Sequence, residues 1–207
     1  MSRRLQIVAV ALLAGFSLSA CGSEKAPSGA EAGTTVSDSP SGTGKDADRG
    51  DRKTSMDMQG AAERADGMLD TVLGKIDPEV EWAHGPTTKG SCDVTRRRTV
   101  MTIVSEDRRQ DFLDQIEGIW RTAGYRIKAK NTDPVFPAVY AVTKDGFGIS
   151  VSIRARGQAF FEADTPCVKE STVADSTTRP KGKDYRGVYP LPAPNVRSGH
   201  WSGGGSA

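Results

Sequence analysis

Few residues of this chain have the types and spacings that catalysis requires. The sequence contains only two histidines, His84 and His200, which are too few for a histidine-rich metal site and give little material for a Ser-His-Asp triad. Glu79 and Glu81 could act as a pair of catalytic carboxylates, but they follow Pro78 in an expected loop, where solvated side chains are the commoner outcome. No nucleophile elbow, P-loop or dinucleotide fingerprint occurs. We therefore expect a non-enzymatic protein without a cofactor or a metal site.

Basic residues form the one pattern that indicates a binding surface. Arg126, Lys128 and Lys130 alternate with apolar residues in an expected strand, and Arg154 points to the same side of a later strand. If these strands are neighbours, the four cations share the open face of a sheet and form a candidate anion-binding face, with interactions that salt weakens. The alternative stays open, because long cationic side chains also keep an uncovered sheet soluble and block edge pairing.

Two segments show the three- and four-residue spacing of apolar side chains that is typical of an amphipathic helix. The first runs from Met56 to Ile76 and ends where Asp77-Pro78 disfavours helical backbone angles. The second follows Ser105, has two acids in its first turn and ends at Gly124, a favoured C-terminal cap. The polar face of the first helix mixes both signs of charge, which favours covering a sheet over binding a membrane or a partner.

The other regular elements are strands, with a loop expected over 82–93. After Gly124 the apolar period becomes two, and Lys144-Asp145-Gly146 predicts a hairpin turn. The expected strands are 94–104, 125–130, 138–143, 147–154 and 158–163. This order predicts an α+β fold, a two-layer sandwich with two helices packed on one face of an antiparallel sheet of about four to five strands.

Low-complexity sequence flanks this domain, which we place at residues 56–170. Residues 21–55 are rich in Gly, Ser, Thr and Asp and predict a disordered tether, because they can bury too little apolar surface to offset the entropy of ordering. Residues 171–207 are rich in Pro and Gly and predict a disordered tail. The tyrosines among those prolines leave a docking segment open as the alternative.

The first residues have the parts of a secretory signal. Arg3 and Arg4 precede an apolar run from Leu5 to Leu18, which is too short to span a bilayer comfortably. We therefore expect residues 1–20 to be removed as a signal peptide. The arginine pair also suggests twin-arginine export, but Leu5-Gln6-Ile7 fits that pattern poorly, so the choice between this route and general secretion stays open.

Leu18-Ser19-Ala20-Cys21 closes this signal and resembles the bacterial lipobox. The resemblance implies that the Cys21 thiol receives a diacylglyceryl group, that cleavage occurs before it, and that acyl chains such as palmitate anchor the protein to the extracytoplasmic face of the cell membrane. Two or more chains anchor stably, at about 0.8 kcal/mol per buried methylene. In general layout the chain resembles the small membrane-anchored lipoproteins of Gram-positive actinobacteria. An ordinary secretory signal with a chance cysteine is the alternative.

Cys92 and Cys167 remain once Cys21 is acylated. Because an exported compartment favours oxidised cysteines, we expect these two to form a disulfide. The loop that they close predicts roughly 4 to 5 kcal/mol of stabilisation in the chain-entropy model. A redox-active or metal-binding pair is the alternative, but it usually requires closer spacing, such as Cys-x-x-Cys.

Charge narrows the remaining classes of function. The chain has 28 Lys and Arg against 26 Asp and Glu, and losing Arg3 and Arg4 with the signal makes the two counts equal. This balance argues against a nucleic-acid binder, which needs a concentrated basic face. We expect a membrane-anchored lipoprotein whose domain binds an envelope ligand, such as an anionic envelope component. An envelope enzyme using carboxylate chemistry and a purely structural envelope protein are the alternatives, and the oligomeric state stays open.

Overall fold

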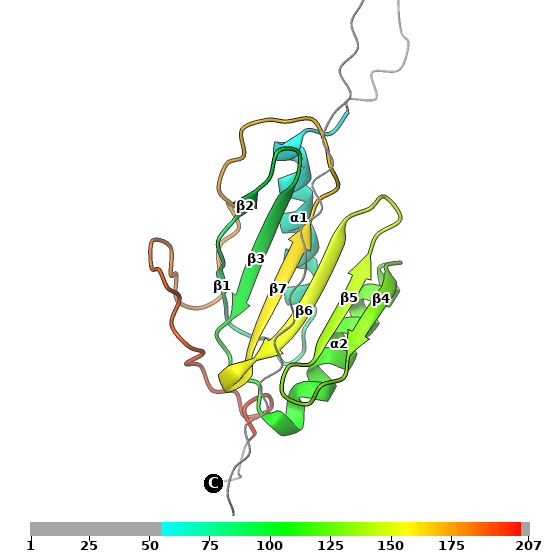
Figure 1. Cartoon of the computed structure of the whole chain (residues 1–207). Coiled ribbons are helices and arrows are strands. Elements are labelled where there is room, and N and C mark those ends of the chain that lie inside the picture. The colour runs from blue at the N-terminus through cyan, green and yellow to red at the C-terminus, as the bar shows by residue number, and fades with distance from the viewer. Residues whose placement is uncertain (1–54, 204–207) are drawn as a thin grey trace, which may run out of the picture. The chain divides into compact units, whose positions relative to one another are not determined.

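A computed structural model describes residues 55–203, within which the chain forms two α-helices and a seven-stranded antiparallel sheet (Figure 1). Helix α1 spans Met58–Leu73, and α2 spans Arg109–Thr122 directly after a short 3-10 helix, η1, at Glu106–Arg108. Both helices lie on the same face of the sheet, and no helix of the described part covers the other face. The predicted α+β class is therefore confirmed. The predicted signal peptide, Cys21 and the tether up to residue 54 lie outside the described residues.

The sheet has more strands than expected, because two short strands form in the region predicted to be a loop. The strands are β1 (Trp82–His84), β2 (Thr88–Lys89), β3 (Val94–Val100), β4 (Arg126–Asn131), β5 (Ala138–Val142), β6 (Gly148–Arg154) and β7 (Gln158–Asp164). Their order across the sheet is β1-β3-β7-β6-β5-β4, and β2 pairs with β3 as well. A strand of two or three residues has no period that a sequence can show. Only pairing with β3 defines β1 and β2.

Helix α1 is fixed by a cap and by a buried stripe. The Asp57 carboxylate accepts a hydrogen bond from the Gly60 amide at 2.9 Å, which satisfies a donor that the first helical turn leaves without a partner. Buried side chains of α1, among them Leu69, pack with Phe112 of α2 and Phe161 of β7. The two phenylalanine rings meet edge to face with their centroids 6.5 Å apart. The core thus lies between the helices and the sheet.

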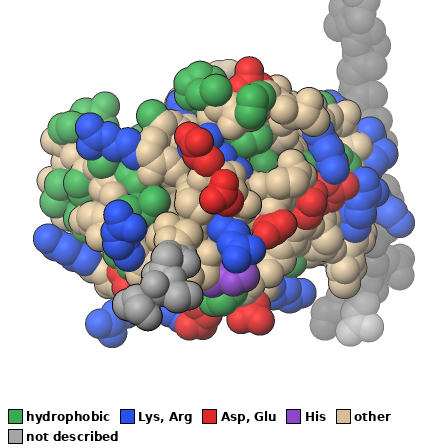
Figure 2. All heavy atoms as spheres, turned by 90° about the horizontal axis from the view of Figure 1, so that it is seen from below, with side chains coloured by type: hydrophobic (Ala, Val, Ile, Leu, Met, Phe, Trp, Pro, Cys, Tyr) green, Lys and Arg blue, Asp and Glu red, His purple; other side chains and the backbone are tan. Residues whose placement is uncertain are grey.

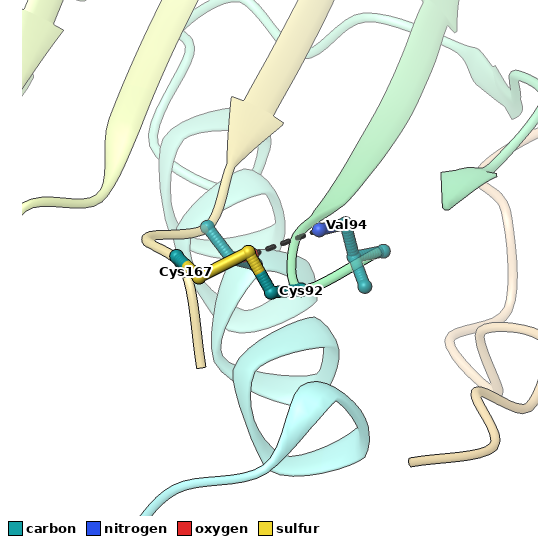
Figure 3. The surroundings of a disulfide bond; sticks show 4 residues. Cys92, Val94 and Cys167 are labelled. Atoms are coloured by element: carbon teal, nitrogen blue, oxygen red, sulfur yellow. Dashed lines mark hydrogen bonds between the residues drawn. A yellow bond between two sulfur atoms is a disulfide. The ribbon is translucent and has the colours of Figure 1, made fainter. Parts of the chain in front are cut away.

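The predicted disulfide between Cys92 and Cys167 is confirmed (Figure 3). It joins the residues that precede β3 to those that follow β7, two neighbouring strands, across 75 positions of sequence. Hydrogen bonds flank the bond: the Val168 amide donates to the Cys92 carbonyl at 2.8 Å, and the Val94 amide donates to the Thr165 hydroxyl at 2.9 Å. The disulfide therefore clamps the end of the sheet from which the C-terminal segment departs.

The structure differs from the predicted disordered tail over residues 171–203, which we call the C-terminal segment. This segment runs along the β1 edge of the sheet (orange to red in Figure 1). Tyr185 and Trp201 are buried, Trp201 to 1% exposure. The Trp201 indole donates to the Pro78 carbonyl at 2.6 Å and meets the Phe112 ring edge to face at 5.1 Å. Tyr185 and Trp201 are single buried residues far apart in the sequence, so they produce no periodic pattern. The Pro- and Gly-rich composition around them predicted disorder instead.

Among the described residues, the main cluster of the core extends from Ala61 to Trp201, inside the compact unit Arg49–Ala207. The core therefore reaches beyond the predicted domain of residues 56–170. Within 55–203, no helix combines the length and the apolar character needed to cross a membrane.

Candidate functional site

The predicted anion-binding face does not assemble as one patch. Arg126 lies opposite Val142, which in turn lies opposite Gly148 at the start of β6. Arg154 ends the same strand and lies opposite Gln158. The length of β6 separates the two cations along the sheet by about 20 Å. They stand at opposite ends of the open face.

Lys130 leaves that face altogether. A β-bulge just before Ala129 shifts the register of β4, so that Lys130 lies opposite the buried Val139 and turns toward α2. There its ammonium forms an ion pair with Glu117. Hydrogen bonding from Lys130, and then from Arg121, holds the pKa of Glu117 below its usual value against the opposing effect of desolvation.

Lys128 stays on the open face but has acidic neighbours. It lines a shallow hollow together with Glu162 and Asp164 of β7. The prediction of a shared basic face for Arg126, Lys128, Lys130 and Arg154 is therefore corrected. Strict alternation would have aligned the three residues of β4, and the bulge breaks that alternation.

Arg96 and Arg98 of β3 form the least expected part of the fold. Both project from the helix-covered face, and their residues are 2% and 1% exposed. Asp66 of α1 contacts both, at 3.1 Å from Arg96 Nε and 2.7 Å from Arg98 Nη2. Asp70, one turn further along α1, lies 3.4 Å from Arg98 Nη2. Two cations thus meet two anions, one buried (Asp66) and one partly exposed (Asp70), which balances the charge as buried ions require. We call these four residues the arginine cluster.

The C-terminal segment adds hydrogen-bond partners to the arginine cluster. Arg96 Nη2 donates to the Ala174 carbonyl at 2.6 Å, and Arg98 Nη2 donates to the Ser176 hydroxyl at 3.1 Å. Hydrogen bonds that involve a charged group contribute about 1.5 to 3 kcal/mol each. The cluster therefore joins three parts of the chain: α1, β3 and the C-terminal segment.

A pocket of about 310 Å³ lies beside this cluster, between the β1–β2 corner and the C-terminal segment. Its volume is at the lower end of the range for small-molecule sites. Arg98 forms part of its wall, and Arg98 Nε is a buried donor without a hydrogen-bond partner among residues 55–203. We call this cavity the His84 pocket. Its lining includes His84, Thr87, Arg98, Asp175, Arg186 and Tyr189.

His84 is partly buried in the wall of this pocket. Its Nε2 lies 2.8 Å from the Thr178 carbonyl, which can only accept, so Nε2 carries the proton. Its ring meets the Trp82 ring edge to face at 5.3 Å. Burial lowers the pKa of His84; the Thr178 hydrogen bond opposes this effect, and the charge of Arg98 adds to it. The imidazole is therefore neutral at neutral pH, and its Nδ1 is an acceptor.

Aromatic and charged side chains of the C-terminal segment form the outer wall of the pocket. Tyr185 is buried, and its hydroxyl accepts a hydrogen bond from the Asn195 amide at 3.0 Å. Arg186 forms an ion pair with Asp184 at 3.0 Å. Tyr189 is 87% exposed. The pocket thus combines an apolar wall with a few polar groups that can fix the orientation of a ligand.

The polar side chains of the site are engaged in hydrogen bonds and ion pairs. His84 donates to a carbonyl rather than activating a nucleophile, and the Ser176 hydroxyl accepts from Arg98. Both carboxylate oxygens of Asp66 already contact arginines. In the part of the chain that the structure describes, no group of three His, Cys, Asp or Glu residues is placed to hold a metal ion.

Comparison of the chain with protein-family models, curated proteins and solved structures gave no match. The class of the protein is therefore defined by its own fold and site. It is an α+β domain with a pocket between the edge of its sheet and a C-terminal segment.

Sequence reasoning missed most of the pocket, because the segment that forms half of it was expected to be disordered. Of the residues considered for chemistry, His84 alone enters the pocket. Glu79 forms an ion pair with Lys181, and the ring of His200 lies 4.5 Å from that of Trp201. The available signal was the presence of three aromatic residues in residues 171–207, since disordered sequence is poor in such side chains.

Proposed function

We propose that this protein is an extracytoplasmic, non-enzymatic lipoprotein whose domain binds a small envelope ligand in the His84 pocket. The observation that supports binding is the lining of the pocket, where the cationic side chains of Arg98 and Arg186 lie with the neutral ring of His84 beside apolar side chains. Such a lining combines apolar surface with a few polar groups, as small-molecule sites do.

The anchoring part of the proposal depends on the lipobox resemblance at Cys21. The disulfide supports the same compartment, because paired cysteines persist where the surroundings are oxidising. In this proposal the acylated Cys21 holds the domain at the outer surface of the cell membrane, within reach of envelope components. We do not expect a nucleic acid as a partner, because such a partner needs a continuous basic face and Arg126 and Arg154 lie at opposite ends of the sheet.

One observation favours the enzymatic alternative. Asp66 and Asp70 both contact Arg98 Nη2 and both line a second hollow of about 240 Å³ beside α1. Paired acids in a cleft are what carboxylate chemistry needs. The Thr178 hydroxyl, however, donates to the other Asp70 oxygen at 2.6 Å, so that neither carboxylate has an unoccupied oxygen. We therefore favour binding.

Two measurements test the proposal. Mass spectrometry of the protein from its native membrane should find an acylated amino-terminal Cys21, and an unmodified amino terminus elsewhere would refute the anchor. For the pocket, the protein is purified from the envelope fraction, and small molecules are extracted and identified. His84→Trp should fill the pocket and abolish their retention, whereas Tyr140→Trp on the exposed sheet face should not. Equal retention by both variants, or no retained molecule at low salt, would refute the binding site.

A further inference from the structure

We infer that the ligand of the His84 pocket is a single-chain amphiphile, with an anionic head in the pocket and a hydrocarbon chain on the open face of the sheet. The inference rests on the proposed ligand-binding function of this pocket and adds the chemical class of the ligand. Three observations support it: a hollow that shares lining residues with the His84 pocket, exposed side chains where the two cavities adjoin, and a difference in net charge between the two linings.

The hollow that adjoins the His84 pocket is not the one beside α1. It measures about 290 Å³ and lies on the open face of the sheet. Phe160 of β7 is one of its lining residues, and we call this cavity the Phe160 hollow. Pro86, Tyr189 and Leu191 line both this hollow and the His84 pocket. The two cavities therefore meet at these three side chains, and together they form a groove that an elongated ligand could occupy.

Two of the three side chains where the hollows meet, Pro86 and Tyr189, are exposed to solvent, Tyr189 to 87%. Val188, which lines the His84 pocket alone, is 49% exposed. On the side of the molecule along which the C-terminal segment runs, hydrophobic side chains lie between Lys and Arg side chains (left in Figures 1 and 2). Exposed apolar side chains grouped at a groove mark a binding site more often than a passive surface.

The net charge of the lining changes from positive to neutral along the groove. Two cations, Arg98 and Arg186, line the His84 pocket against one acid, Asp175. The ion pair of Arg186 with Asp184 is exposed and so weakly held, which allows Arg186 to turn to an anionic head. In the Phe160 hollow, Arg97 and Glu162 neutralise each other at 2.8 Å. An anion fits the first cavity and a hydrocarbon chain fits the second.

Calorimetric titration of the oxidised chain from Gly22 to Ala207 tests this inference. This chain lacks only the predicted signal peptide and the predicted site of acylation, and it keeps all of the compact unit Arg49–Ala207. The probes are dodecanoate and dodecyl phosphate below their micelle concentrations, which separate a carboxylate head from a phosphate head. Butyrate and inorganic phosphate supply each head without a long chain, and dodecyltrimethylammonium supplies the chain with a cation. We expect at least one anionic amphiphile to bind more than 10-fold more tightly than its short-chain analogue and than the cationic amphiphile.

Variants then assign the two ends of the ligand. Phe160→Ser should weaken dodecanoate or dodecyl phosphate about 10-fold and leave the short-chain anion unchanged. Arg186→Gln should weaken both about 10-fold. Tyr140→Ser, on the same face but outside both cavities, is the matched control and should change nothing. Thermal unfolding close to that of the unsubstituted chain shows that each variant is folded.

Three results would overturn the inference. If butyrate or phosphate binds as tightly as the long-chain probe, and His84→Trp still abolishes binding, the pocket stands and the hydrocarbon chain is wrong. If the cationic amphiphile binds equally well, the anionic head is wrong. Arg154 lies over the Phe160 ring at 5.2 Å, so a loss with Arg154→Gln as large as with Arg186→Gln would place the head at the opposite end of the groove.

Discussion

Replacing Trp201 with alanine tests whether the C-terminal segment belongs to the core. The indole is 1% exposed, packs on Phe112 at 5.1 Å and donates to the Pro78 carbonyl at 2.6 Å. Truncating a fully buried Trp costs about 3 to 5 kcal/mol. The lost hydrogen bond adds about 1 kcal/mol. We therefore expect the free energy of unfolding to fall by about 4 to 6 kcal/mol, a large part of the total for a domain of this size.

Urea unfolding followed by far-ultraviolet circular dichroism measures this change without relying on the fluorescence of the deleted ring. Trp201→Phe keeps most of the packing and loses the hydrogen bond, so its expected cost is about 1 to 2 kcal/mol. Tyr189→Ala, at a side chain that is 87% exposed, should cost less than about 0.5 kcal/mol. If Trp201→Ala is no more destabilising than Tyr189→Ala, the segment is not part of the core and the prediction of a disordered tail is restored.

Three further perturbations test the disulfide, the arginine cluster and His84. Replacing both disulfide cysteines with serine should lower the free energy of unfolding by about 4 to 5 kcal/mol, measured by urea unfolding against the oxidised chain; a loss below about 1 kcal/mol would contradict the clamp. Asp66→Asn removes the carboxylate that the two buried arginines share and should cost about 3 to 5 kcal/mol. The same type of change at the exposed Glu63, Glu63→Gln, should cost less than about 0.5 kcal/mol, and equal losses would refute the cluster's structural role. Burial lowers the pKa of His84 in the folded chain, so the unfolded chain binds a proton at this histidine more readily. The free energy of unfolding that depends on a neutral His84 is therefore fully present above about pH 6.5 and is lost as the pH falls toward the folded pKa. His84→Gln should remove that loss in unfolding curves taken between about pH 7.5 and 5, and an unchanged pH profile would refute it.

The elements with a clear period were predictable from the sequence. The apolar spacing located α1 and α2, and the alternation after Gly124 located β4 to β7. The disulfide was predictable as well, from the expected compartment and the number of cysteines. The bulge in β4 was not, because a bulge depends on how two strands pair rather than on the composition of either. It moved Lys130 from the open face of the sheet to Glu117.

The candidate site was much less predictable than the fold. Arg96 and Arg98 occupy helix-facing positions of β3 that alternation assigns to apolar side chains. They are tolerated because Asp66 and Asp70, four positions apart on α1, supply the opposite charges. A sequence does not show which helix will pack on which strand, so it could not pair these four residues. The pocket also needs the C-terminal segment, whose attachment depends on single anchors and on its hydrogen bonds to the same arginines.

The position of Trp201 makes the core depend on a residue that follows every helix and strand of residues 55–203. Chains are made from the amino end, so both helices and all seven strands emerge before this indole reaches Pro78. A product that stops short of it would leave the Phe112 ring in contact with water and open to proteolysis. The core is therefore complete only once this indole has packed against Phe112 and Pro78.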